Sequence, residues 1–162
     1  MDYLWSPWRY QYLTAPKKPG GCVFCRIASE SDDEENLVVH RAEHNFVVLN
    51  RFPYTSGHVM VVPYIHVSDL SGIDDAAANE MMALMRLSER HLRAVYRPEG
   101  INLGMNVGES AGAGIAAHIH MHVLARWHGD SNFMTTIAET RILPEDLATT
   151  WRRLRDAFAA VR

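Results

Sequence analysis

Residues 118–127 have the sequence His-Ile-His-Met-His-Val-Leu-Ala-Arg-Trp, which is the most informative stretch of the chain. Histidine alternates with apolar residues from His118 through His120 to His122. Side chains at every second position of a β-strand lie on the same face. The alternation therefore predicts a strand over 118–127, with three imidazoles on one face and the apolar residues turned toward the core. A helix would scatter the imidazoles around its axis.

Three interpretations of this histidine face compete. In the first, the imidazoles are incidental polar groups, and the strict alternation argues against this. In the second, they bind a metal, since histidine is the commonest metal ligand. In the third, one imidazole is a nucleophile that its neighbours orient. The glycine-rich stretch GESAGAGIAA, residues 108–117, comes directly before them. Backbone N–H groups of such a turn bind phosphate oxygens, which favours covalent chemistry on a phosphorylated substrate for at least one histidine.

Short apolar runs bounded by turn residues predict further strands over 36–41, 45–50, 57–63 and 101–108. The second and third form an antiparallel hairpin with a longer loop. We interpret His58, near the start of the third run, as structural. Apolar residues at three- and four-residue steps predict a helix over 74–96, with Asp74 as its N-cap, and a final helix from near Pro144. The pattern is typical of an α+β domain with a mostly antiparallel sheet.

The size of the chain, 162 residues, suits one domain. Hydrophobic residues make up 48% and charged residues 22%, which excludes collagen, a coiled coil or a disordered tail for the whole chain. The 16 Lys and Arg residues against 19 Asp and Glu residues give a formal charge of -3, which argues against binding duplex nucleic acid. A small phosphorylated ligand remains compatible with this charge. We expect an aromatic N-terminal arm over residues 1–21 and a single domain over 22–162.

The cellular compartment is predicted from two sequence patterns, that of a membrane helix and that of a signal peptide. No apolar run approaches the roughly 18 residues that a membrane helix requires. The N-terminus has no basic segment followed by an apolar one, so it does not have the pattern of a signal peptide. We therefore predict a cytoplasmic protein without membrane contact. In that compartment the pair Cys22 and Cys25, spaced C-x-x-C, indicates metal or redox chemistry.

These motifs resemble the histidine-triad (HIT) superfamily. The alternating histidines followed by Val123 match its signature, NFVVLNRFPYTSGHVMVVP is similar to its upstream hairpin, and NVGESAGAGIAAH is similar to its phosphate loop. The resemblance covers about residues 22–133. The arm sequence LWSPWR and the downstream RWHGDSNF are similar to a bacterial subgroup described as diadenosine-polyphosphate phosphorylases or hydrolases.

The resemblance implies a HIT-like fold: a five-stranded, mostly antiparallel sheet with one long and one C-terminal helix, in a homodimer. It also implies an enzyme that cleaves dinucleoside polyphosphates, such as diadenosine tetraphosphate, through a covalent nucleotidyl-histidine intermediate. In this sequence His120 is then the nucleophile, and His122 hydrogen-bonds phosphate oxygens or the bridging oxygen. Phosphorolysis and hydrolysis both remain open.

Further residues are assigned on the same resemblance. Asn50 matches an asparagine that contacts the ribose in the branch acting on dinucleoside polyphosphates, where the phosphoramidase branch usually has aspartate. Asn106 lies near the phosphate or the leaving group. Backbone donors come from the phosphate loop, namely Gly112, Ala113, Gly114 and Ile115. Many relatives have hydroxyl or amide side chains in this loop, and this sequence has none there, so its phosphate contacts rest on main-chain N–H groups and His122.

The cysteine pair predicts a zinc site. A redox pair would follow a strand, and Lys17 to Gly21 is a poor strand, so two further ligands are sought for a metal. Our candidates are His66 and His118, and the resulting set of Cys22, Cys25, His66 and His118 matches the structural zinc site of the zinc-bearing relatives. A closed four-coordinate site of this kind is structural. His44 is the nearest alternative ligand, ahead of His40 and His128.

Two other functions remain open at this stage. One is a hydrolase of adenosine monophosphoramidates, against which Asn50 and the aromatic arm argue. The other is a zinc-stabilised nucleotide-binding module without turnover, which the missing hydroxyl groups of the phosphate loop leave open. We expect no organic cofactor, and a small nucleotide or dinucleotide as the partner.

Overall fold

The computed structural model describes residues 21–130 and 143–160. The predicted N-terminal arm, residues 1–21, therefore lies outside the described residues except for Gly21. The extent of the catalytic domain over 22–162 stays a prediction for the same reason. Among the described helices, none combines the length and the apolar character that crossing a membrane requires.

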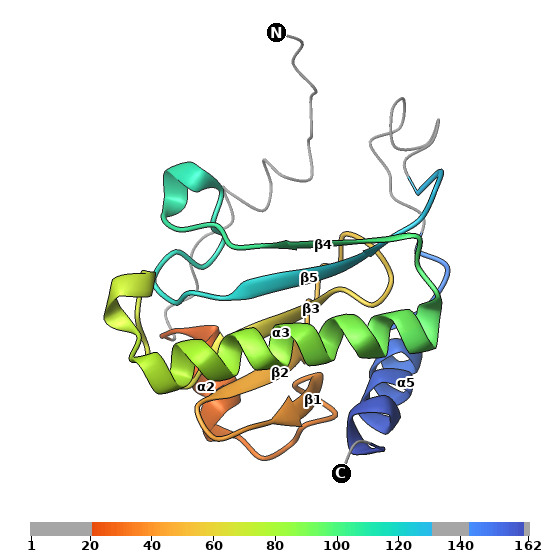
Figure 1. The fold of residues 1–162 in the computed structure, drawn as a ribbon. Coiled ribbons are helices and arrows are strands. Elements are labelled where there is room, and N and C mark those ends of the chain that lie inside the picture. The colour runs from red at the N-terminus through yellow and green to blue at the C-terminus, as the bar shows by residue number, and fades with distance from the viewer. Residues whose placement is uncertain (1–20, 131–142, 161–162) are drawn as a thin grey trace, which may run out of the picture.

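The centre of the molecule is a five-stranded antiparallel sheet in the order β1-β2-β3-β5-β4. The strands are β1 (Val38–Arg41), β2 (Asn45–Leu49), β3 (Val59–Pro63), β4 (Gly100–Gly104) and β5 (Met121–Arg126). Figure 1 shows β1 and β4 at opposite edges of this sheet. The predicted α+β fold class with a five-stranded antiparallel sheet is confirmed.

Two predicted helices are present with their caps. The long helix α3 spans Asp75–Tyr96, and the side chain of Asp74 accepts a hydrogen bond from the N–H of Ala77. The C-terminal helix α5 spans Leu147–Ala159, and Asp146 caps it in the same way. A short helix, α2 (Val23–Ser29), was not predicted from the sequence. Two 3₁₀ turns complete the described elements, η1 (Leu70–Gly72) and η2 (Glu109–Ala111).

The two faces of the sheet bury different partners. On one face Val47, Val61 and Val123 pack with residues of α3 and α5, and α3 is seen crossing this face in Figure 1. On the other face a second cluster forms around two residues of α2, Phe24 and Ile27, with side chains of β1, β2 and β3. Strand alternation thus supplies both clusters from the same strands. The face toward α2 is the one that carries the candidate site.

The predicted strand over 118–127 is shorter in the structure, where β5 begins at Met121. Residues 118–120 leave the ladder because the N–H of Ile119 donates to the carbonyl of Val67, outside the sheet. The alternation of faces nevertheless continues through this segment. Ile119 is buried with α3, whereas the rings of His118 and His120 both lie against Phe24 of α2. The histidine face was therefore predicted correctly although the strand boundary was wrong.

We expect the β2–β3 loop to depend on Gly57, which has φ of +77°. A Cβ there would lie 2.8 Å from Leu92 and 3.0 Å from Tyr96, so Gly57→Ala adds a core clash to the cost of a positive φ. The predicted loss is about 2–4 kcal/mol in the free energy of unfolding. Gly129→Ala is the matched control, since Gly129 has φ of +79° with nothing within 4 Å of such a Cβ. It should cost only about 1 kcal/mol. Equal losses in urea denaturation would contradict the packing argument.

Candidate active site

A cavity of about 190 Å³ lies on the α2 side of the sheet, between α2, the β2–β3 loop and the loop that follows β4. Seven of the residues predicted to bind nucleotide or phosphate, or to act in catalysis, line it: Asn50, Asn106, Gly112, Gly114, Ile115, His120 and His122. His118 and Ala113 are not among the lining residues. The structure thus brings most of the predicted site together from four separate stretches of the chain.

The phosphate loop offers fewer backbone donors than predicted. The N–H of Ala113 donates to the carbonyl of Gly108, and the N–H of Gly112 donates to the carbonyl of Glu109. Both donors are used inside the loop in this structure, and their assignment as phosphate ligands stays a prediction. The N–H groups of Gly114 and Ile115 donate to no acceptor among the described residues, and both residues line the cavity. These two donors remain available for an anion.

His120 is held as a neutral ring with one defined tautomer. Its Nδ1 lies 2.9 Å from the carbonyl oxygen of His118, so Nδ1 carries the proton and Nε2 keeps its lone pair. The side chain is only 5% exposed, and burial lowers the pKa of His120 below its ordinary value. An uncharged imidazole with a free Nε2 is a competent nucleophile.

His122 is oriented by a residue that the sequence analysis interpreted as structural, His58. The N–H of Tyr54 donates to Nδ1 of His58, which places the proton of His58 on Nε2. Nε2 of His58 lies 2.8 Å from Nδ1 of His122, so His122 accepts there and carries its own proton on Nε2. Burial, with a smaller contribution from His120, lowers the pKa of His122 to about 4. His122 is therefore a neutral hydrogen-bond donor beside His120.

The contact of His58 with His122 was not predicted from the sequence, because it depends on a pairing between distant strands. Met60 of β3 lies opposite His122 of β5, and His58, two residues earlier, lies on the same side and is 1% exposed. The available signal was the alternation His58, Met60, Val62 in the third apolar run. Only knowledge that β3 pairs with β5 would have turned this signal into a contact.

Asn50 lines the cavity, and one of the two polar groups of its side-chain amide is already hydrogen-bonded. Its Oδ1 accepts the N–H of Phe52 at 2.9 Å, which fixes the orientation of the side chain. Nδ2 then has no acceptor among the described residues. Asn50 can therefore donate to a hydroxyl group of a bound ligand.

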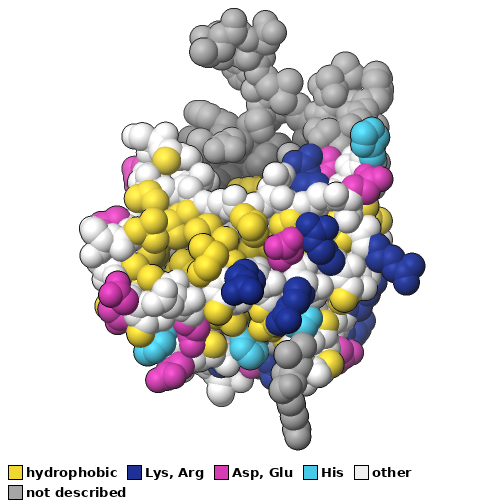
Figure 2. All heavy atoms as spheres, viewed as in Figure 1, with side chains coloured by type: hydrophobic (Ala, Val, Ile, Leu, Met, Phe, Trp, Pro, Cys, Tyr) yellow, Lys and Arg dark blue, Asp and Glu magenta, His cyan; other side chains and the backbone are white. Residues whose placement is uncertain are grey.

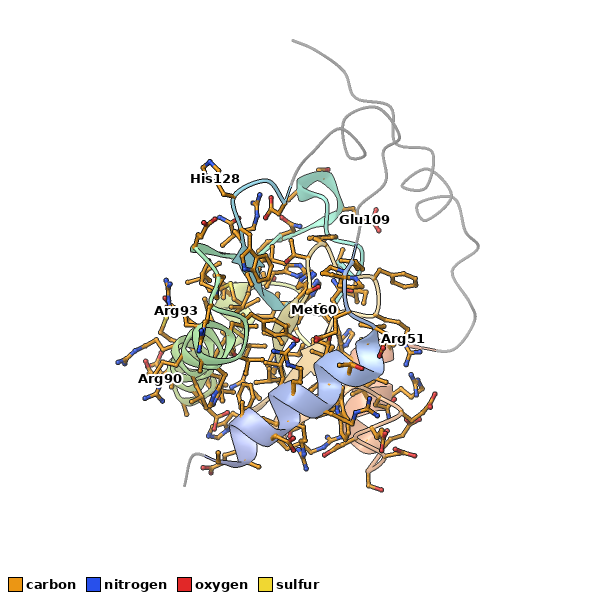
Figure 3. The ribbon with its side chains drawn as sticks, turned by 90° about the vertical axis from the view of Figure 1, so that its right-hand side faces the viewer. Arg51, Met60, Arg90, Arg93, Glu109 and His128 are labelled. Carbon is orange, nitrogen blue, oxygen red and sulfur yellow. The ribbon has the colours of Figure 1, made fainter. Side chains whose placement is uncertain are left out.

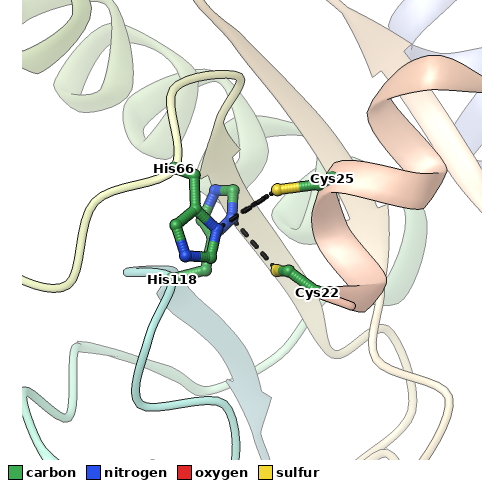
Figure 4. A group of neighbouring side chains, drawn as sticks. All are labelled: Cys22, Cys25, His66 and His118. Carbon is green, nitrogen blue, oxygen red and sulfur yellow. Dashed lines mark hydrogen bonds between the residues drawn. The ribbon is translucent and has the colours of Figure 1, made fainter. Parts of the chain in front are cut away.

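The predicted metal ligands form one group, shown in Figure 4. One ligand atom from each of Cys22, Cys25, His66 and His118 lies within 4.8 Å of the others. Sulfur–nitrogen distances of 3.3 Å for Cys22–His118, 3.2 Å for Cys25–His66 and 3.6 Å for Cys25–His118 are close to the about 3.6 Å edge of a tetrahedron with zinc–ligand bond lengths. The alternative ligand His44 is not in the group, and its backbone N–H donates to the carboxylate of Glu80.

His118 belongs to both halves of the site. Its Nε2 lies 2.8 Å from the carbonyl oxygen of Pro63, so Nε2–H donates there and Nδ1 presents a lone pair to the two sulfurs. This is the arrangement by which a second hydrogen bond orients a metal-ligating histidine. Its backbone carbonyl holds His120, and Phe24, between the two cysteines, contacts both rings. Together, a neutral nucleophile, a neutral donor and free backbone N–H groups suit transfer of a phosphoryl or nucleotidyl group.

We expect the ring of His122 to titrate far below an ordinary histidine. In a proton NMR titration its resonance, assigned with His122→Asn, should have a midpoint near pH 4. The unfolded chain takes up this proton near pH 6.5, so the folded state is destabilised as the pH falls below that value, by up to about 3 kcal/mol near pH 4. A midpoint at or above pH 6.5 would show that the ring is solvated.

Comparisons with known proteins agree with this geometry. Residues 31–129 match the HIT domain family. The chain is 43% identical to an AP-4-A phosphorylase from Mycobacterium tuberculosis, over 98% of this chain and 85% of that protein. It is 30% identical to the protein hit of Bacillus subtilis, over 69% of this chain and 75% of that protein.

Solved structures show the same fold. A zinc-bound histidine triad family protein from Mycobacterium smegmatis superposes with a TM-score of 0.70 at 31% identity, covering 86% of this chain and 94% of that one. A diadenosine triphosphate hydrolase from Plasmodium falciparum, solved with cyclomarin A, gives a TM-score of 0.62 at 12% identity, covering 78% of this chain and 77% of that one. The second likeness concerns the fold alone.

Proposed function

This chain belongs to the histidine-triad (HIT) family, and from that premise we propose that it is a dinucleoside polyphosphate phosphorylase with His120 as its nucleophile. The observation that carries the proposal is the buried pair of neutral histidines at the cavity, one with a free Nε2 and one with a protonated Nε2. The 43% identical AP-4-A phosphorylase supports the same reaction. The enzyme cleaves the polyphosphate bridge in two steps.

In the first step the lone pair of Nε2 of His120 attacks the α-phosphorus, and the bond from that phosphorus to the bridging oxygen breaks. The electron pair leaves with the nucleoside polyphosphate. His122 donates a hydrogen bond to the departing oxygen without transferring its proton, because the leaving polyphosphate is a stable anion. The imidazole of His120 becomes positively charged, and the carbonyl of His118 at Nδ1 stabilises that charge.

In the second step an acceptor releases the nucleotide from His120. An oxygen of inorganic phosphate attacks the same phosphorus, the nitrogen–phosphorus bond breaks, and the proton of the phosphate passes to solvent. Nε2 recovers its lone pair, so the ring is again neutral. With phosphate as acceptor an adenylated enzyme yields ADP, and with water it yields AMP.

The remaining residues bind the transferred nucleotide. Asn50 donates through Nδ2 to a ribose hydroxyl, and the N–H groups of Gly114 and Ile115 donate to the equatorial phosphate oxygens. Asn106 lies on the cavity wall, where it contacts the phosphate or the leaving group. Apolar side chains from α2, from the turn before β1 and from β2 form walls for the base, namely Val23, Ile27, Leu37 and Val48.

The acceptor is tested with diadenosine tetraphosphate in the presence and absence of inorganic phosphate, with products separated by chromatography. We expect ADP and ATP, formed only when phosphate is present. AMP and ATP in equal amounts at all phosphate concentrations would make the enzyme a hydrolase instead. His120→Ala should lower kcat by more than about 10³-fold, since it removes the nucleophile. Turnover unchanged in this variant would reject the mechanism.

The metal that fits the Cys22, Cys25, His66 and His118 group is zinc, with a structural role. Two thiolates and two imidazoles are a preferred donor set for zinc, and four protein ligands leave no coordination position for substrate. Bound there, zinc would fix α2 against the segment that carries His120. Reduced thiols at this site suit the cytoplasm, where we place the protein.

Metal analysis of the purified protein should find about one zinc per chain. Cys25→Ser should lose the metal and lower the melting temperature, because it removes one of four ligands. His44→Ala is the control that should keep the zinc. A folded wild type without metal, or loss of zinc in both variants, would contradict the assignment.

We also propose that the enzyme is a homodimer in which β4 pairs with β4 of a second copy. β4 is an edge strand, and Leu103 on it is 49% exposed. Figure 2 shows apolar side chains gathered on the face on which Figure 1 shows β4 and α3. Met82 of α3 is 55% exposed. Light scattering should give twice the mass of one chain, and a monomer at micromolar concentration would reject the pairing.

A further inference from the structure

A second and larger cavity, of about 650 Å³, lies beside the active site at the end of β5. We propose that this distal cavity binds the second nucleoside of a dinucleoside polyphosphate, the one that leaves with the polyphosphate. The inference rests on the proposed function and adds a subsite to it. Four of the described residues that line the cavity carry the argument: Tyr54, Tyr96, Trp127 and His128.

The volume of the active-site cavity indicates that it holds only part of such a substrate. Pockets that enclose drug-sized ligands measure about 300–1,000 Å³. The active-site cavity measures about 190 Å³, below this range, whereas the distal cavity measures about 650 Å³. A substrate with two nucleosides therefore needs room beyond the first cavity, and the distal cavity provides it.

The two cavities are neighbours, because Tyr54 lines both of them. The ring of Tyr54 lies 6.1 Å from the ring of His122, the donor to the leaving group. Trp127 follows β5 and is five residues beyond His122, or about 17 Å along an extended chain. A bridge of several phosphates is the part of the substrate that covers such a distance. Figure 3 labels His128, which lies on the turn after β5 and lines the distal cavity.

The walls of the distal cavity suit a nucleoside. Tyr54, Tyr96 and Trp127 present aromatic surface, on which a base stacks whatever its identity.

The charges around the distal cavity do not oppose a polyanion. Glu145 is paired with Arg153, and it also accepts hydrogen bonds from Tyr96 and Thr150. Asp130 is paired with Arg126 through both carboxylate oxygens. Each carboxylate that lines the described part of the cavity thus has a cationic partner. The repulsion that an unpaired carboxylate would exert on a phosphate chain is absent from these two groups.

The test compares diadenosine tetraphosphate with adenosine 5′-tetraphosphate, which has the same phosphate chain and no second nucleoside. For the wild type we expect kcat/KM to be about tenfold higher for the dinucleotide, the size of one base-stacking contact. Trp127→Leu should remove about tenfold from kcat/KM for the dinucleotide and leave the mononucleotide within twofold. Trp127→Phe keeps an aromatic ring and is the matched control, with values near those of the wild type.

Two results would overturn the distal subsite: equal kcat/KM of the wild type for both substrates, or a loss in Trp127→Leu that is the same for both. The wild-type comparison decides even if Trp127→Leu does not fold. Calorimetry on His120→Ala repeats the comparison without turnover and should show the dinucleotide binding about tenfold more tightly. If the wild type turns over neither substrate, the proposed function fails, and the calorimetric comparison still decides the subsite.

Discussion

The hydrogen bond between Nδ1 of His120 and the carbonyl oxygen of His118 is the contact on which the rest of the site depends. It fixes the tautomer of His120, and in the proposed mechanism it supplies a negative dipole where positive charge develops during attack. The carbonyl is itself fixed, because the His118 ring is held between the carbonyl of Pro63 and the two cysteine sulfurs. A metal in that group would therefore act on catalysis by position, through one peptide unit.

Burial is the second constraint on the chemistry. The sheet places His58, His120 and His122 in an enclosed region, where desolvation lowers the pKa of the last two. Neutral imidazoles are what the reaction needs, since a protonated His120 has no lone pair. The hydrogen bond from His58 to His122 satisfies one ring nitrogen of each residue, so that most of their cost of burial is recovered. Stability and function thus favour the same protonation state.

The loop between β2 and β3 connects the elements of this arrangement. Asn50 at its start lines the active-site cavity, and Tyr54 in its middle lies against His58 and lines both cavities. Gly57 at its end allows the close approach of Leu92 and Tyr96. One short loop therefore contributes to both cavities and contacts the histidine that orients His122.

The sequence by itself determined the longer elements that have a local period. Alternation at 118–122 gave the histidine face, and the helical stripe with Asp74 gave α3, because side-chain direction within one element follows from backbone geometry alone. Only the tertiary structure decided the contacts between distant segments. It selected His66 over His44 as the partner of Cys25, 41 positions away, and joined His58 to His122 across 64 positions. It also formed the distal cavity from five stretches of the chain, namely residues 54–56, 96, 127–130, 144–145 and 153. These contacts depend on which strands pair and which helix covers each face, and packing of the whole core sets that choice.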